Sequence, residues 1–61
     1  MQDCGRVFRT WATLTAWLYE TLPAEQAEQL IQQAEQVTDV HDRFVEFTHN
    51  DIRYHARITR L

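Results

Sequence analysis

Three histidines lie among carboxylic acids in the stretch HDRFVEFTHNDIRYH, near the end of this 61-residue chain. Histidine and carboxylate side chains bind metals and transfer protons, so any chemistry is expected here. Glu46 and His49 have the Glu-x-x-His spacing found in di-iron helical bundles. Asp51 and His55 have the i, i+4 spacing of a side-chain pair on one helix face.

Neither pair predicts a reactive site once its surroundings are considered. On a helix, Glu46 and His49 fall on the solvated side, whereas metal sites in bundles need ligands that point inward. His41 and His55 would lie about 21 Å apart along one helix, too far to bind one metal. The chain has no serine, no glycine-rich phosphate loop and no zinc-ligand spacing. The sequence therefore predicts a protein that is not an enzyme and uses no metal or cofactor.

The elements that position these residues are predicted to be helices. One glycine precedes the first periodic segment, and the only proline, Pro23, separates it from the second. Apolar residues recur at spacings of three and four in residues 6–22, and the same period continues from 24 to about 60. The expected fold is therefore all-α: a single domain, 1–61, formed by a helical hairpin of a short helix over 6–22 and a long helix over about 24–60. On this long helix Ala56 would fall on the solvated side.

The unequal lengths of the two helices predict a homodimer. The first would be roughly 25 Å long and the second up to roughly 57 Å, so the second would extend beyond its cover. A second copy would then complete an assembly like a four-helix bundle. The expected dimer interface contains Phe44, Val45, Phe47, Ile52, Tyr54, Ile58, Leu61, His41 and His55. The alternative is a monomeric three-helix bundle with a break near 38–40, where Asp39 would cap a third helix; 48–51 offers a second break.

Size and composition are consistent with that expectation. A chain of this length forms a marginal core and usually needs a disulfide, a metal or a partner subunit. The single cysteine, Cys4, cannot form an internal disulfide, and a lone thiol is typical of a reducing compartment. No secretory signal and no run of apolar residues long enough to span a membrane is present. The expectation is a cytoplasmic protein that does not bind membranes.

The charge distribution favours a protein partner. The formal net charge is −3, and the segment from Glu20 to Asp42 carries six acidic and no basic residues. This excess argues against binding duplex DNA. The leading prediction is a small regulatory or inhibitor protein of bacterial, plasmid or phage type, which binds another protein through its helical dimer surface. The candidate partner-binding residues are Trp17, Glu28, Glu35, Asp39 and Asp42.

The alternative function is RNA binding. The predicted layout, in length and hairpin arrangement, is similar to that of the plasmid copy-control helical hairpin. That family dimerises into a four-helix bundle and binds paired RNA loops. In this chain Arg53, Arg57 and Arg60 would form the basic strip that contacts RNA.

Overall fold

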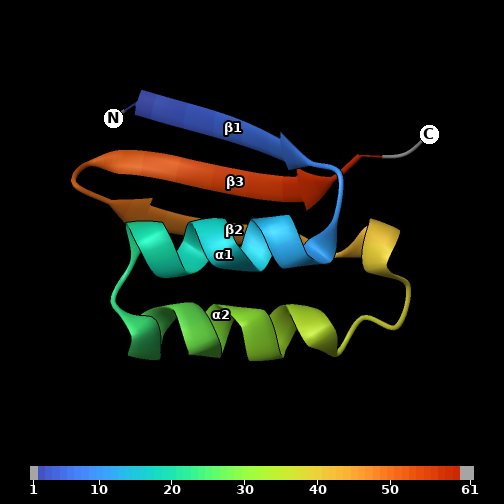
Figure 1. The fold of residues 1–61 in the computed structure, drawn as a ribbon. Helices are drawn as coiled ribbons and strands as arrows, with labels where there is room; N and C mark the ends of the chain where they lie inside the picture. The colour runs from blue at the N-terminus through green and yellow to red at the C-terminus, as the bar shows by residue number, and fades with distance from the viewer. Residues whose placement is uncertain (1, 60–61) are drawn as a thin grey trace.

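A computed structural model describes residues 2–59 of the chain and shows a mixed α/β fold (Figure 1). The elements, in chain order, are β1 (Gln2–Phe8), α1 (Trp11–Thr21), α2 (Ala24–Glu35), the short 3-10 helix η1 (Val40–Asp42), β2 (Phe44–His49) and β3 (Ile52–Ile58). The prediction of an all-α fold is wrong, because the first element of the described residues, β1, and the last two, β2 and β3, are strands. The four-helix bundle and the three-helix bundle are both excluded for the same reason.

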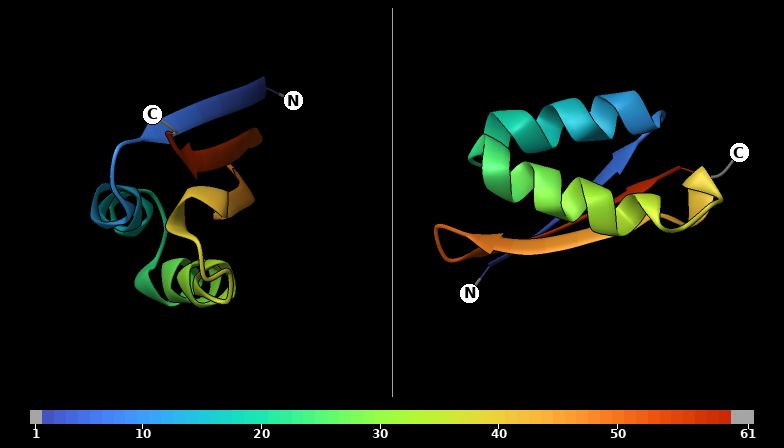
Figure 2. Two further views of the ribbon diagram at one scale, coloured as in Figure 1. Left: turned by 90° about the vertical axis from the view of Figure 1, so that its right-hand side faces the viewer. Right: turned by 90° about the horizontal axis from the view of Figure 1, so that it is seen from below.

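The three strands form one sheet in the order β1-β3-β2. β3 is the central strand; β1 pairs with it in parallel and β2 in antiparallel orientation. The two helices cover one face of this sheet and leave the other face uncovered (Figure 2). The parallel pairing continues beyond β1, because the amide of Thr59 donates to the carbonyl of Phe8 at 2.8 Å.

The hairpin between β2 and β3 explains why the long helix does not form. Asn50 and Asp51 both have positive φ, 51° and 64°, and together form a two-residue turn of the type that matches the twist of paired strands. Asn and Asp tolerate this left-handed conformation better than most residues. The flanking segments FVEFTH and IRYHARI are rich in aromatic and β-branched residues, which favour strands. The second expected break, 48–51, is thus the site of a turn.

Helix α1 begins at a threonine cap. The side chain of Thr10 accepts a hydrogen bond from the amide of Thr13 at 3.2 Å, which satisfies one of the unpaired donors of the first turn. Leu14 and Leu18 are fully buried, as the predicted helical spacing requires. The helix ends at Thr21, before Leu22 and the proline that follows.

Helix α2 is much shorter than predicted. It starts after Pro23 and buries Ala27, Ile31 and Ala34, which recur at spacings of four and three. It ends at Glu35. The prediction of one helix from residue 24 to about residue 60 is therefore wrong for the residues after Glu35. The third helix expected after a break near 38–40 is not an α-helix: α2 has already ended at Glu35, and Asp39 caps the three-residue η1 by accepting a hydrogen bond from the amide of His41 at 2.9 Å.

The core lies between the helices and the covered face of the sheet. Leu14 and Leu18 from α1 meet Val45, Ala56 and Ile58 from the strands, and all five are buried. An aromatic cluster extends this core: the Trp17 ring lies 5.4–5.8 Å, between centroids, from the rings of Phe8, Phe47 and Tyr54. The chain therefore buries by itself three of the apolar residues for which a second copy was expected, Val45, Phe47 and Ile58, whereas Phe44 stays exposed.

Candidate functional site

The uncovered face of the sheet, called the open face below, is defined by the strand register. Residues paired across neighbouring strands point to the same side, and successive residues alternate. The open face therefore carries three rows of side chains, one from each set of register partners: Val7, Arg57 and Phe44; Gly5, His55 and Glu46; Asp3, Arg53 and Thr48. The remaining strand residues face the helices, where Val45, Phe47, Ala56 and Ile58 are buried.

Two arginines on the central strand have no partner on the open face. The side chains of Arg53 and Arg57 are exposed, and neither guanidinium makes a hydrogen bond or ion pair with any other residue in 2–59. They differ in this from Arg6 and Arg43, whose guanidinium carbons lie over the rings of Trp17 and Trp11 at 6.0 Å and 4.7 Å. Arg53 and Arg57 are thus free to bind a ligand, whereas the other two pack against aromatic side chains.

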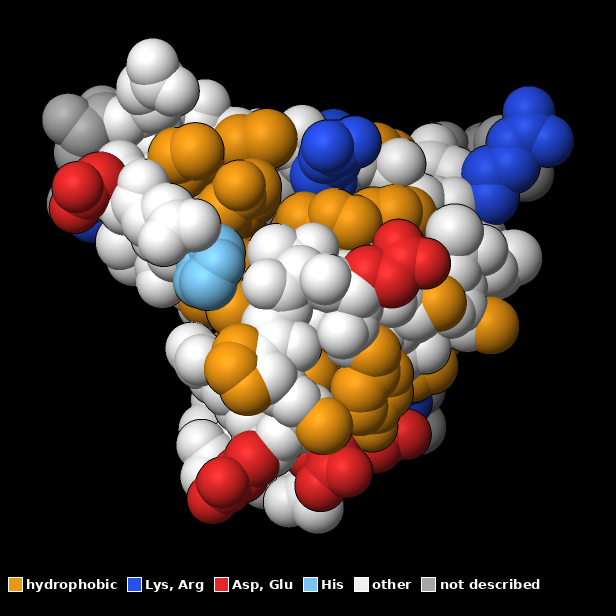
Figure 3. All heavy atoms as spheres, turned by 60° about the vertical axis from the view of Figure 1, so that its left-hand side comes forward, with side chains coloured by type: hydrophobic (Ala, Val, Ile, Leu, Met, Phe, Trp, Pro, Cys, Tyr) orange, Lys and Arg blue, Asp and Glu red, His pale blue; other side chains and the backbone are white. Residues whose placement is uncertain are grey.

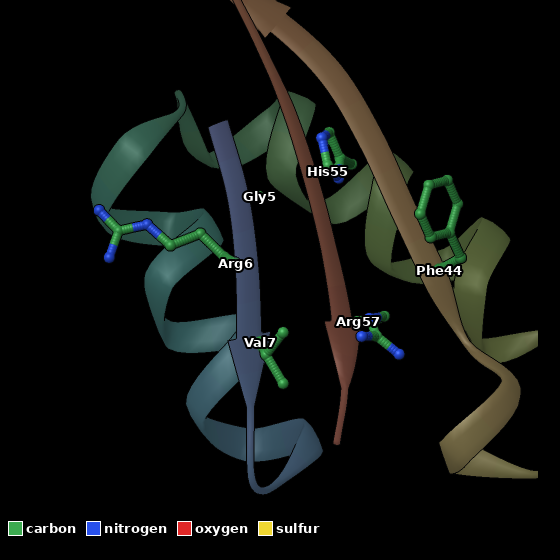
Figure 4. Close-up of a pocket in the computed structure, with 6 residues that line it drawn as sticks. All are labelled: Gly5, Arg6, Val7, Phe44, His55 and Arg57. Carbon is green, nitrogen blue, oxygen red and sulfur yellow. The ribbon is translucent and has the colours of Figure 1, made fainter. Parts of the chain in front are cut away.

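A shallow hollow of about 250 Å³ lies at one end of the open face (Figure 4). Val7 and Phe44 flank it with side chains that are 55% and 54% exposed, and Arg57 lies between them in the register. Gly5 contributes by lacking a side chain, since a Cβ there would lie only 3.1 Å from Cε1 of His55. The hollow combines apolar walls with one unpaired cation, which suits an anionic ligand that has a flat or apolar part.

A second surface lies along the outer edge of β2. This strand is at the edge of the sheet, and α2 packs beside it on the covered face. A groove of about 330 Å³ runs between the two elements. Its apolar lining is Leu30, Ala34, Val37, Phe44 and Val45, and its polar lining is Gln33, Asp42 and Glu46. Phe44 belongs to both the groove and the hollow. The groove and the unpaired β2 edge together are called the β2 groove below.

The histidines are dispersed across the fold. His41 lies on η1, where its Nδ1 is 3.2 Å from the carbonyl oxygen of Thr59. His49 ends β2 on the covered face, and His55 sits in the middle of the open face. Within residues 2–59 no three His, Cys, Asp or Glu side chains are grouped so as to hold a metal ion. The Glu46/His49 spacing therefore places the two side chains on different faces of the sheet, away from each other.

The predicted dimer interface is divided between core and surface. Val45, Phe47 and Ile58 are buried in this chain, and Phe44 and His41 are exposed. The half-buried members are Ile52, Tyr54 and His55. Leu61 lies outside the described residues. This set shares no single face because the helix that would have aligned it does not form.

The predicted partner-binding residues also separate. Trp17 is half-buried in the aromatic cluster, whereas Glu28 and Glu35 are exposed on α2 and Asp39 and Asp42 are exposed at η1. Acidic side chains gather at the lower end of the molecule in Figure 3, where α2 lies, and the larger basic groups are in its upper part. The acidic segment recognised in the sequence is therefore a feature of the helical layer.

The predicted RNA-binding arginines are brought together by a different element from the one expected. Arg53 and Arg57 lie on the same face of β3, since a spacing of four returns to the same side of a strand just as it does on a helix. Arg60 lies outside the described residues. Sequence reasoning missed Gly5 and Val7, which join this face through β1. The strict alternation in IRYHARI could have indicated that β3 is a strand, but it carries no information about Gly5 and Val7.

No helix among residues 2–59 has the length and apolar content needed to cross a lipid bilayer. Comparisons of the chain with protein-family models, with curated proteins and with solved structures found no match.

Proposed function

We propose that this protein is a non-enzymatic regulatory protein that binds an extended segment of a partner protein as an additional strand beside β2. The observation that carries the proposal is the coincidence of an unpaired strand edge with an apolar groove along it. Addition of a strand at a sheet edge is a general mode of peptide recognition, in which backbone hydrogen bonds supply affinity and side-chain pockets supply specificity. The lone Cys4 thiol fits a cytoplasmic site of action.

The backbone groups that such a segment would meet follow from the hairpin. In a two-residue hairpin the residues that flank the turn, His49 and Ile52, exchange hydrogen bonds, and hydrogen-bonded pairs then alternate along the strands. Val45, Phe47 and His49 therefore direct their backbone groups toward β3. The amides and carbonyls that point outward, ready for a new strand, belong to Phe44, Glu46 and Thr48.

Side chains of the added strand would alternate between two environments. Those on the covered face would enter the β2 groove against Leu30, Ala34 and Val37, and Val37 is 39% exposed in the unbound chain. Those on the open face would lie beside Glu46, which favours a basic residue there. The preferred partner segment is thus extended, with apolar residues alternating with polar ones and a basic residue opposite Glu46.

A second copy of β2 is a poor occupant of the same edge. In an antiparallel arrangement centred on Glu46, the Glu46 carboxylates of the two copies would lie directly opposite each other. Like charges in that position destabilise strand pairing. The homodimer expected from the sequence was based on the exposed side of a long helix, and no such helix remains after Glu35.

The test is a matched pair of substitutions at the centre of the edge. Glu46→Pro and Glu46→Ala both remove the carboxylate, but only the proline also removes the outward amide while leaving the bonds to β3. Peptides selected from a random display library on the native protein should bind the proline variant about 5- to 150-fold more weakly than the alanine variant, the effect of one lost hydrogen bond.

Bound peptide should also protect the amides of Phe44, Glu46 and Thr48 from hydrogen exchange. Equal peptide affinity of the proline and alanine variants, with both folded by circular dichroism, would contradict strand addition. Protection confined to α2 would likewise place the partner elsewhere.

A further inference from the structure

We propose that the open face is a second binding site, for single-stranded RNA, whose phosphates pair with Arg53 and Arg57 and whose bases stack on Phe44 and His55. This inference depends on side chains of the sheet face and not on the backbone of the strand edge, and it shares only Phe44 with the lining of the β2 groove. Single-stranded nucleic acids are commonly bound by cationic side chains along the backbone and by flat side chains under the bases.

The cationic groups have the spacing that an extended strand of nucleic acid needs. Arg53 and Arg57 project from the same face of β3 with His55 between them, and residues four apart on a strand are about 13 Å apart. This is about twice the separation of successive phosphates in an extended single strand, so the two arginines can contact alternate phosphates while His55 faces the nucleotide between them. The two arginine side chains are exposed and make no hydrogen bond or ion pair within residues 2–59, so binding a phosphate breaks no existing side-chain interaction.

The hollow beside Arg57 provides the stacking surface. Phe44 forms one wall with a side chain that is 54% exposed, and Val7 forms the opposite wall (Figure 4). His55 lies next along β3, and Gly5 beside it leaves room for the imidazole ring, which a Cβ would crowd at 3.1 Å. A nucleobase in this hollow would contact an aromatic ring and a guanidinium at once, as bases do on single-strand binding surfaces.

Two other occupants fit the open face less well. A second copy placed centrally on this face would set one β3 on the other, and this brings arginines against arginines whichever way the two strands run. An acidic peptide lying across the face would leave its own backbone groups unpaired and would have no flat group to stack on Phe44. A ligand with phosphates and bases complements both the charge of the two arginines and the shape of the hollow beside Phe44.

Two carboxylates on the open face are expected to lower its affinity for RNA. Asp3 is the register partner of Arg53, and Glu46 is the register partner of His55. Both would repel phosphate. Removal of the Asp3 charge should therefore tighten RNA binding, whereas removal of a charge in the helical layer should have little effect.

The experiment is fluorescence anisotropy with a labelled, mixed-sequence RNA of about ten nucleotides, titrated over a range of salt concentrations. Two phosphate contacts predict a slope of about −1.4 in log K against log salt, and Arg57→Ala or Arg53→Ala should reduce it to about −0.7. Phe44→Ala should weaken binding about 5- to 150-fold without changing the slope. Asp3→Asn should strengthen binding.

Arg9→Ala is the matched control, because Arg9 is an exposed arginine in the connection between β1 and α1. Arg9→Ala should leave the RNA affinity and its salt slope unchanged. Urea unfolding should show that all variants are folded. Absence of RNA binding at low salt would overturn the proposal. So would a slope that Arg53→Ala and Arg57→Ala leave unchanged. Displacement of RNA by polyglutamate, together with no effect of Phe44→Ala, would assign the face to acidic peptides instead.

Discussion

Replacement of Ala56 by leucine tests the fold most directly. Ala56 lies in the middle of β3, faces the helices and is completely buried. A leucine there adds three carbon atoms to a filled core, and overpacking of this kind costs about 1–3 kcal/mol. A chain of this size has a free energy of unfolding of roughly 3–9 kcal/mol, so the loss is a large fraction of the total. A long helix would instead place residue 56 in solvent, where leucine is tolerated.

The assay is urea and thermal unfolding, followed by circular dichroism and by the fluorescence of the two tryptophans, Trp11 and Trp17, which both pack against the core. Each kcal/mol lost should lower the Tm by about 4–8 °C. Ala16→Leu is the matched control, because Ala16 is exposed on α1 and should shift the free energy of unfolding by less than about 0.5 kcal/mol. Identical unfolding midpoints for the two variants would refute the packing of β3 against the helices.

Two further substitutions test the turn and the η1 segment. Asp51→Gly should raise the free energy of unfolding by about 0.5–1 kcal/mol, because glycine adopts the positive φ beside Asn50 without strain; a lower Tm would contradict the turn. Arg43→Ala should lower it by about 1–2 kcal/mol, because it removes the stacking on Trp11 and the 3.0 Å hydrogen bond from Nε to the carbonyl of Val37. Unchanged thermal unfolding of Arg43→Ala would show that neither contact contributes.

The helical part of the fold could be predicted because its signals are local. Leu14 and Leu18 recur at helical spacing, Pro23 separates the two helices, and Asp39 caps the 3-10 helix η1. These features depend on residues within a few positions of one another. A single sequence is sufficient to show them, and the structure confirms that they lie in or next to helices or at their ends.

The strands were missed because their signals are ambiguous or non-local. Arg53 and Arg57 share a face on a helix and on a strand alike, so a spacing of four does not separate the two. The turn formed by Asn50 and Asp51 contains no glycine, which weakens the usual hairpin signal. β1 is mostly exposed and polar, and it is a strand because β3 pairs with it from across the chain.

The site was accordingly predicted in part. Arg53 and Arg57 were recognised as a possible RNA-binding pair, and the structure keeps them on one surface. The contributions of Gly5, Val7 and Phe44 to that surface depend on the strand register, which no local pattern contains.

The order of the strands has a consequence for how the chain acquires its fold during synthesis. β3 is the central strand but the last of the three to leave the ribosome, and β1 and β2 pair only with it. Until residue 58 has emerged, the sheet can have no complete ladder, whereas the two helices can already form. The nascent protein should therefore pass through a helical stage without a sheet, and a stop codon before residue 52 should leave a protease-sensitive chain.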